Sequence, residues 1–201
     1  IARSNNIIFY KLGYRLYQKY KGSELVEFAR KFGLGSDTGI DLPGEKSGLV
    51  PDGKWKRKKF GHGWLPGDSI NLSIGQGNLL TTPLQIAQMV SVIANGGIMY
   101  RPFIVDKVID SDGNLVKDIK PRVKKKLKFG NNVFEILKKG MQEVTQSQGG
   151  TASSVFLDFP VKIAGKTGTA QTSVRNANHG WFVGFAPVED PEIVVLVFLE
   201  N

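Results

Sequence analysis

Four consecutive residues late in the chain, Lys166-Thr167-Gly168-Thr169, place an ammonium group beside two hydroxyls. These groups make a compact binding site for a carboxylate, because the cation supplies charge and the hydroxyls supply hydrogen bonds. Gly168 leaves room for a substrate backbone against the strand, and an edge strand can pair with an extended peptide. The triplet Lys166-Thr167-Gly168 consists of common residues and also occurs by chance in many sequences. On its own it favours a solvated strand end over a binding site.

Longer stretches on both sides of the triplet carry more information. A run from His179 to Pro187 follows it, and residues 67–77 and 81–85 precede it. Together these stretches resemble the transpeptidase domain of class B penicillin-binding proteins, the enzymes that cross-link bacterial peptidoglycan. The basic region from Trp55 to Lys59 resembles the elongation-type branch of that family. The resemblance covers essentially all 201 residues.

The family carries three motifs: Ser-x-x-Lys with the nucleophile, Ser-x-Asn, and Lys-Thr-Gly. Ser4-Asn5-Asn6 matches the second motif, and residues 166–168 match the third. No serine of the chain has a lysine three residues later. The family places the nucleophile some tens of residues before Ser-x-Asn and continues beyond the last strand into a closing helix. We therefore expect residues 1–201 to form a partial transpeptidase domain, truncated at both ends.

The resemblance implies a role for each matching residue. In the family, a serine attacks the carbonyl between two D-alanines of a stem peptide, and an amine of a second stem peptide resolves the acyl-enzyme. Ser4 would relay a proton to the leaving amine together with Lys166, and Asn6 would hold the amide of the acyl donor. Thr167 and Thr169 would bind the terminal carboxylate of the donor. The N–H of Thr169 would be one oxyanion donor.

The resemblance also implies the surroundings of the complete protein. Its substrates would be peptidoglycan stem peptides ending in D-Ala-D-Ala, which β-lactams imitate. Its partners would belong to the cell-wall elongation machinery and include a membrane glycan polymerase. It would lie on the outer face of the bacterial cytoplasmic membrane, anchored by an N-terminal segment absent from this chain. No cofactor is expected, and two histidines without any cysteine favour no metal site.

Three other functions agree with part of the sequence. A β-lactamase shares the Lys-Thr-Gly strand, but the long basic region and Gly75-Gln76-Gly77 favour the transpeptidase. A non-catalytic sensor or scaffold agrees with the missing nucleophile, and a Ser-x-x-Lys upstream of Ile1 would decide against it. A polyanion-binding protein agrees with the net charge of +9. The two basic runs, in 54–59 and 120–128, lie in no recognisable nucleic-acid-binding pattern, so we expect solvated loops and no nucleic-acid partner.

The spacing of apolar residues predicts the elements that position these motifs. Helices are expected over 7–20, from an N-cap at Ser23 to Phe32, from Thr82-Pro83 to residue 94, and over 133–144. Residues 33–67 are expected to be a long loop with little regular structure. Strands are expected in a hairpin of 104–109 and 115–119, and over 161–166, 181–186 and 192–199. Helices followed by antiparallel strands indicate an α+β fold, in agreement with the penicillin-binding and serine β-lactamase-like fold that the resemblance implies.

Four residues near the motifs have two interpretations each. Gln76 either faces the site or belongs to a tight turn between two glycines, and the sequence favours neither. Trp181 and Phe182 are expected in the core rather than as a substrate platform. His179 is expected in a loop ahead of a strand, where it would stabilise a turn.

Overall fold

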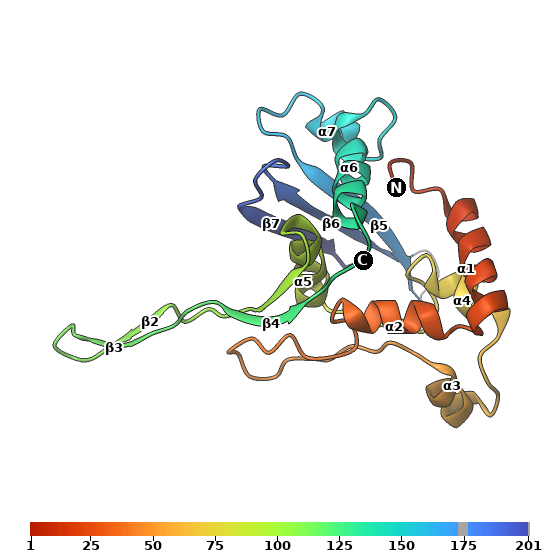
Figure 1. The fold of residues 1–201 in the computed structure, drawn as a ribbon, viewed down its shortest axis with the longest axis horizontal. Helices are drawn as coiled ribbons and strands as arrows, with labels where there is room; N and C mark the ends of the chain where they lie inside the picture. Colours follow the sequence, from red (N-terminus) through yellow and green to blue (C-terminus); the bar gives the residue numbers. More distant parts are fainter. Residues whose placement is uncertain (173–176, 201) are drawn as a thin grey trace.

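The computed structural model describes residues 1–172 and 177–200. Helices dominate the first half of the chain, and the longest strands come last (Figure 1). In chain order the elements are α1 (Asn6–Tyr20), α2 (Ser23–Lys31), α3 (Gly53–Phe60), α4 (Pro66–Leu72), α5 (Pro83–Ala94), β1 (Ile98–Arg101), β2 (Lys107–Ile109), β3 (Leu115–Asp118), β4 (Arg122–Lys126), α6 (Val133–Gln146), α7 (Ser153–Phe156), β5 (Ala164–Gln171), β6 (Asn178–Ala186) and β7 (Ile193–Leu199). The expected α+β fold is confirmed.

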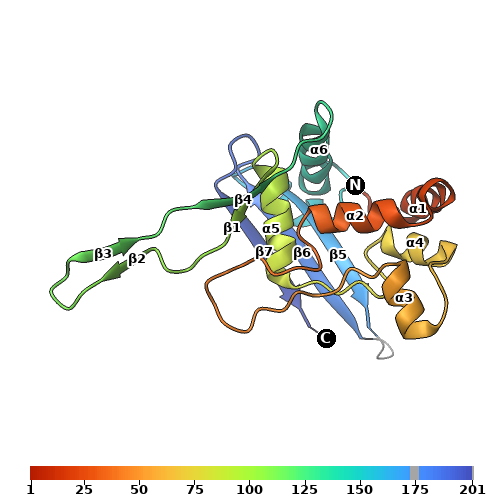
Figure 2. The same ribbon diagram turned by 60° about the horizontal axis from the view of Figure 1, so that its bottom comes forward.

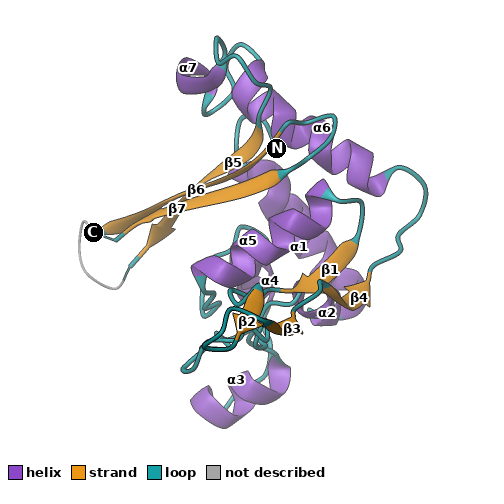
Figure 3. Ribbon diagram, turned by 90° about the vertical axis from the view of Figure 1, so that its left-hand side faces the viewer, coloured by secondary structure: helices purple, strands orange, loops and turns teal. Residues whose placement is uncertain are grey.

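A three-stranded antiparallel sheet in the order β5-β6-β7 forms the centre of the molecule. Helices α5 and α6 cover one of its faces (Figures 2 and 3). The core between these layers consists of buried residues from both helices and from β5 and β6, namely Val90, Ala94, Met141, Ala164, Val183 and Phe185. On β7 the alternate residues Ile193, Val195, Val197 and Leu199 are exposed, as the period of two of a strand covered on one face requires. The predicted strands are confirmed, with β5 beginning at Ala164 and β6 beginning earlier than expected, at Asn178.

The buried helix α5 begins as the sequence predicts. Thr82 is its N-cap, and the Thr82 hydroxyl accepts a hydrogen bond from the N–H of Gln85 at 3.2 Å. The Gln85 side-chain oxygen accepts a hydrogen bond from the N–H of Thr82, which completes a capping box. The same Gln85 amide donates to the carbonyls of Ser36 and Ser47, so this fully buried polar side chain ties the loop between α2 and α3 to α5.

Helices α1 and α4 pack against each other at very short range beside the sheet. Gly13 allows this contact, because a Cβ there would lie 2.8 Å from the carbonyl oxygen of Ser69. The Ser73 hydroxyl, one turn further along, donates to the carbonyls of Phe9 and Ile70. The predicted helix over 7–20 is confirmed, and Asn5 caps it by accepting from the N–H groups of Ile7 and Ile8.

The predicted hairpin is confirmed as β2 and β3, which project away from the rest of the chain (Figures 1 and 2). The Asp110 carboxylate holds its turn by accepting from the N–H groups of Asp112 and Asn114. At its base the Asp41 carboxylate accepts from the N–H groups of Ile104 and Val105, at 2.8 and 3.0 Å. The bonds from Val105 and Ile104 lower the pKa of Asp41 below its ordinary value.

One expectation for the first half of the chain is incomplete and another is wrong. Residues 33–67 are mostly without regular structure, as expected, but they also contain α3, which starts where the Asp52 carboxylate accepts from the N–H of Trp55 at 2.8 Å. Helix α2 begins at Ser23 itself, with Gly22 as its N-cap in a left-handed conformation.

The basic runs are also more regular than expected. The first lies largely on α3, and the second contains β4, which pairs with β1 in an antiparallel ladder. Every side chain of β4 is exposed, so the expected solvation of the second basic run is correct there. The expected loop is wrong, because residues 122–126 form a strand. β4 can carry four basic residues and Val123 because all five of its side chains are exposed.

Candidate functional site

The Lys-Thr-Gly residues lie on β5, an edge strand of the three-stranded sheet. Opposite them on β6, Lys166 pairs with Val183, Thr167 with Phe182, and Thr169 with Gly180. The Thr167 carbonyl accepts from the Lys166 side chain and the Thr169 carbonyl accepts from Gln76, so the main-chain groups of both threonines point away from β6. In an antiparallel strand the N–H and C=O of such a residue point to the same side, so the N–H of Thr169 also points outward. The outer edge of β5 therefore presents an outward-pointing main-chain N–H at Thr169, as expected of an oxyanion donor.

Two motifs that lie 162 residues apart in sequence meet at Lys166. Its ammonium donates a hydrogen bond to the Ser4 hydroxyl and another to the carbonyl of Thr167, the latter at 2.6 Å. Ser4 adopts a left-handed backbone with a φ of 45°, and its N–H bonds the carbonyl of Ile1. A serine in this conformation is uncommon, and such outliers concentrate at functional sites.

Burial among these elements lowers the pKa of Lys166 below its ordinary value, because removal from water disfavours the charged amine. Within the described residues no carboxylate forms an ion pair with Lys166 to oppose this effect. A lysine with a lowered pKa exchanges protons more readily than an exposed one near neutral pH. The Ser4 hydroxyl accepts the ammonium proton, so its own proton remains available to a third group.

Asn6 is the first residue of α1, two residues after Ser4, and its side chain is exposed. Among the described residues its amide makes no hydrogen bond, whereas the neighbouring Asn5 is used as the helix cap. The structure therefore places Asn6 next to the Ser4–Lys166 contact without joining it to them.

Thr151 is a residue of the site that sequence reasoning missed. Its hydroxyl lies 2.8 Å from the hydroxyl of Thr167, and its N–H bonds the carbonyl of Ala2 at 3.2 Å. It connects β5 to the segment that carries Ser4. The local signal is weak: Gly150 precedes it in a position where a Cβ would lie 2.4 Å from two carbonyl oxygens of α6.

Both interpretations that the sequence left open for Gln76 agree with the structure: it lies in a tight turn, and its side chain contacts β5. Gly75 and Gly77 have φ values of 74° and 85°, so the segment is a tight turn. The turn also aims the Gln76 amide at β5, where it donates to the Thr169 carbonyl at 3.2 Å. Gln76 therefore contacts the outer edge of β5 at Thr169.

Gly168, expected to make room for a substrate, is exposed on β5. A Cβ at this position would lie 3.2 Å from the Cβ of Trp181 on the neighbouring strand. The glycine therefore also relieves crowding within the sheet. Trp181 packs on Phe198 with ring centroids 4.3 Å apart, and Phe182 stacks on Phe156, which agrees with packing roles for both aromatic residues.

His179 is not in a loop, as the sequence suggested. It lies within β6, pairs with Ala170, and packs edge-on against Phe198 with centroids 5.2 Å apart. The strand continues past Gly180 because β5 pairs with His179 and Asn178, beyond the last residue of β6 that pairs with β7.

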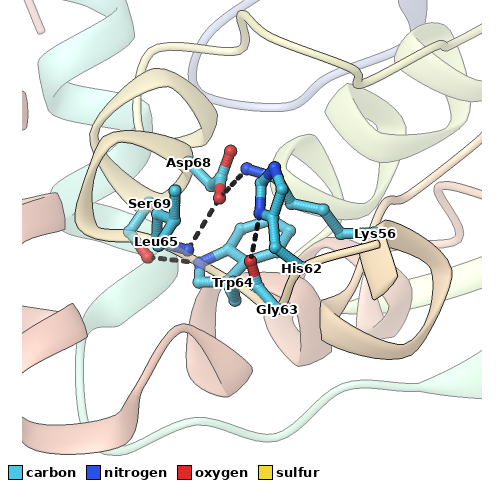
Figure 4. A network of polar contacts seen from close by, with 7 residues as sticks. All are labelled: Lys56, His62, Gly63, Trp64, Leu65, Asp68 and Ser69. Carbon is cyan, nitrogen blue, oxygen red and sulfur yellow. Dashed lines mark hydrogen bonds and ion pairs between the residues drawn. The ribbon is translucent and has the colours of Figure 1, made fainter. Parts of the chain in front are cut away.

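A polar network connects α3 with α4 and the segment between them (Figure 4). The Lys56 ammonium forms an ion pair with the Asp68 carboxylate, which also accepts from the N–H of Leu65 at 2.7 Å. The Trp64 indole donates to the Ser69 hydroxyl at 2.8 Å. A cavity of about 50 Å³ separates this network from the Gln76 turn and is lined by Lys56, Asp68 and Gln76 among others. Lys56 is therefore only 8% exposed. The expectation that the first basic run is solvated is wrong at this residue.

Metal-binding clusters and membrane-spanning helices are both absent from the described part of the chain. In residues 1–172 and 177–200 no group of three or more His, Cys, Asp or Glu side chains is arranged to hold a metal ion. No helix in the same part of the chain has the length and apolar character needed to cross a bilayer.

The penicillin binding protein transpeptidase domain matches the chain over residues 1–201. The chain belongs to this transpeptidase family. It is 33% identical to the peptidoglycan D,D-transpeptidase MrdA of Escherichia coli K12, over all of this chain and 33% of that protein. PBP2 of Pseudomonas aeruginosa, solved in complex with WCK 5153, is 37% identical, with a TM-score of 0.85 over the whole chain and 43% of the solved one.

A complex of PBP2 with MreC from Helicobacter pylori contains a similar domain, 32% identical with a TM-score of 0.84 over all of this chain and 35% of that one. The expected family, its elongation-type branch and its fold are confirmed by these matches. The chain spans about a third of the length of the curated relatives that it matches.

Proposed function

We propose that the protein carrying this chain is a peptidoglycan D,D-transpeptidase that works through a serine acyl-enzyme. The observation that carries the proposal is the Lys166–Ser4 hydrogen bond, which joins the Lys-Thr-Gly and Ser-x-Asn motifs into one site. Membership of the transpeptidase family over the whole chain supports it. The nucleophilic serine would come from residues outside this chain, because no serine here has a lysine three residues later.

The geometry supports a division of labour among the site residues. Ser4, with its hydroxyl accepting from Lys166, donates its own proton to the amine that leaves when the acyl-enzyme forms. The Lys166 ammonium then replaces that proton. Asn6 binds the acyl donor through its exposed amide, and Thr167 and Thr169 bind the terminal carboxylate.

The main chain of β5 supplies the remaining part of the site. The N–H of Thr169 stabilises the oxyanion, and removal of one such donor typically lowers the rate by ~10²–10³. Gln76 keeps that N–H in position through its bond to the Thr169 carbonyl. Gly168 lets the extended donor peptide lie along the strand edge.

Substrates, inhibitors, partners and location follow from the same proposal. The substrates are stem peptides ending in D-Ala-D-Ala, and β-lactams acylate the same serine. The complex of a similar PBP2 with MreC supports elongation partners, among which we include a membrane glycan polymerase. The similarity to MrdA supports a position on the outer face of the cytoplasmic membrane, with an anchor outside residues 1–201.

Acylation of the complete protein by a fluorescent penicillin tests the proposal. Lys166→Met is expected to slow acylation by at least about 10²-fold, because the proton relay and the positive potential both disappear. Lys162→Met is the matched control, since Lys162 is exposed just before β5 and is expected to leave the rate within about twofold. Equal rates for Lys166→Met and the wild type would contradict the assigned role.

Two further measurements separate the alternatives. The 201-residue chain alone is expected to form no covalent adduct with penicillin, and a stoichiometric adduct would contradict the external nucleophile. Rapid release of hydrolysed β-lactam by the complete protein would indicate a β-lactamase. A complete protein that is never acylated would indicate a non-catalytic scaffold.

A further inference from the structure

A cleft of about 650 Å³ lies between the C-terminal end of α1, helix α2 and helix α3. It is separate from the Ser4–Lys166 contact, because it opens at the opposite end of α1. Its volume lies in the range of sites that hold small organic molecules. Its charged lining consists of Lys21, Glu27, Arg30, Asp52, Lys54 and Arg57.

Part of this charge is already neutralised within the protein. The Arg30 guanidinium forms an ion pair with the Asp52 carboxylate at 2.8 Å. The N–H of Trp55 and the guanidinium of Arg30 bond the same carboxylate and lower the pKa of Asp52 below its ordinary value. This pair is structural, because Asp52 is also the N-cap of α3. The remaining lining has three cations and one carboxylate.

Lys21, Lys54 and Arg57 have no carboxylate partner within ion-pair distance among the described residues. Lys54 and Arg57 are three residues apart on α3 and therefore project from the same side of that helix. Lys21 belongs to a different element, because it is the C-cap residue directly after α1. Like charges that face a common space repel each other, and an anion between them removes that repulsion.

The wall behind these cations is held firmly. A Cβ at Gly22, whose φ is 94°, would lie 2.2 Å from the indole ring of Trp64, so the backbone rests directly on that ring. The Trp64 indole is fixed in turn by its bond to Ser69. A cleft with a fixed wall loses little entropy when it binds a ligand.

We propose that this cleft binds a small phosphorylated molecule, with a dianionic phosphate or a diphosphate between Lys21, Lys54 and Arg57. Three cations against one carboxylate leave an excess of two positive charges, which a phosphate monoester or diphosphate matches. The planar guanidinium of Arg57 suits two-point recognition of phosphate oxygens, and the lysines act as point charges. The volume beyond a single phosphate accommodates an organic group beside Trp64.

Isothermal titration calorimetry of the complete protein with sodium pyrophosphate tests the site, with N-acetylglucosamine 1-phosphate as a second probe. We expect a dissociation constant below ~1 mM in dilute buffer and weaker binding as salt is added. A tighter constant for the sugar phosphate than for pyrophosphate would show that the organic group contributes. Absence of heat with both probes at millimolar concentration would overturn the proposal.

Paired variants separate this cleft from the general positive charge of the protein. Lys54→Gln with Arg57→Gln is expected to weaken pyrophosphate binding by at least about tenfold. Lys58→Gln with Lys126→Gln removes the same charge at exposed positions outside the cleft and is expected to change it by less than about threefold. Lys21→Gln, on a separate element, is expected to weaken binding as well. Equal weakening by both pairs would overturn the proposal, whatever the outcome of the penicillin assay.

Discussion

Replacement of Lys56 by Met tests whether the Lys56–Asp68 ion pair in Figure 4 is a buried interaction that stabilises the fold. The side chains of Lys56 and Asp68 are 10% and 17% exposed. Methionine has a similar length and apolar stem, so the substitution removes the charge with little loss of packing. The Asp68 carboxylate keeps its bond to the N–H of Leu65 but loses its cation.

The burial of the two partners sets the expected magnitude. Removing one partner of a fully buried pair costs ~3–5 kcal/mol, and an exposed pair contributes only ~0–1 kcal/mol. Since water still reaches part of the Asp68 carboxylate, we expect Lys56→Met to lower the free energy of unfolding by about 2–3 kcal/mol. Asp68→Asn is expected to have a similar effect, because it leaves the ammonium buried without a carboxylate. The double variant is expected to recover about 2 kcal/mol of the summed losses.

Equilibrium urea unfolding, followed by circular dichroism, measures these differences. With a slope of about 2–3 kcal/mol per molar urea, Lys56→Met should lower the midpoint by about 1 M. Lys58→Met, on the exposed side of the same helix, is the matched control and should stay within about 0.5 kcal/mol. A Lys56→Met midpoint equal to that of the control, or a double variant whose losses simply add, would refute the reasoning.

Two other predictions concern the packing of Gly13 and the titration of Asp41. Gly13→Ala should destabilise the protein by about 1–3 kcal/mol in thermal unfolding, against the helix propensity of alanine, because its Cβ would meet a backbone carbonyl of α4 at 2.8 Å. Gly140→Ala should cost less, since its nearest neighbour is the end of a flexible isoleucine side chain, and a larger loss than for Gly13→Ala would contradict this. For Asp41, the N–H groups of Val105 and Ile104 lower the pKa, so its contribution to stability is present above the ordinary value and lost as pH falls through the lower one. The amide proton shifts of those two residues in NMR spectra should titrate with a midpoint below about 3.9, and a midpoint above it would contradict the bond geometry.

Local features of the sequence predicted those elements whose formation depends on neighbouring residues. Thr82, Pro83 and Gln85 form the start of α5 as their order indicates, because a capping box needs only residues three apart. The hairpin turn around Asp110 follows from an aspartate that bonds the next amides. The two motifs could be recognised for the same reason, since each occupies adjacent positions.

The errors came where tertiary contacts overrode local composition. Residues 54–59 looked like a solvated loop because lysine and arginine dominate them, yet Asp52 starts a helix there and Asp68 removes Lys56 from solvent. His179 was expected in a loop ahead of the strand 181–186, whereas pairing with β5 extends the strand through it. Burial and pairing depend on partners that are distant in sequence.

The sequence by itself determined the family, the α+β arrangement and the residues of both motifs, because each is encoded in short contiguous patterns. Only the tertiary structure decided that Lys166 donates to Ser4, that Thr151 contacts Thr167, and that Gln76 holds the Thr169 carbonyl. The first and last of these contacts join residues more than ninety positions apart, and all three depend on how α1, the Gln76 turn and the start of α7 pack around β5. No local pattern specifies such contacts, because they arise from the topology that brings the N-terminal segment to the edge of the last sheet.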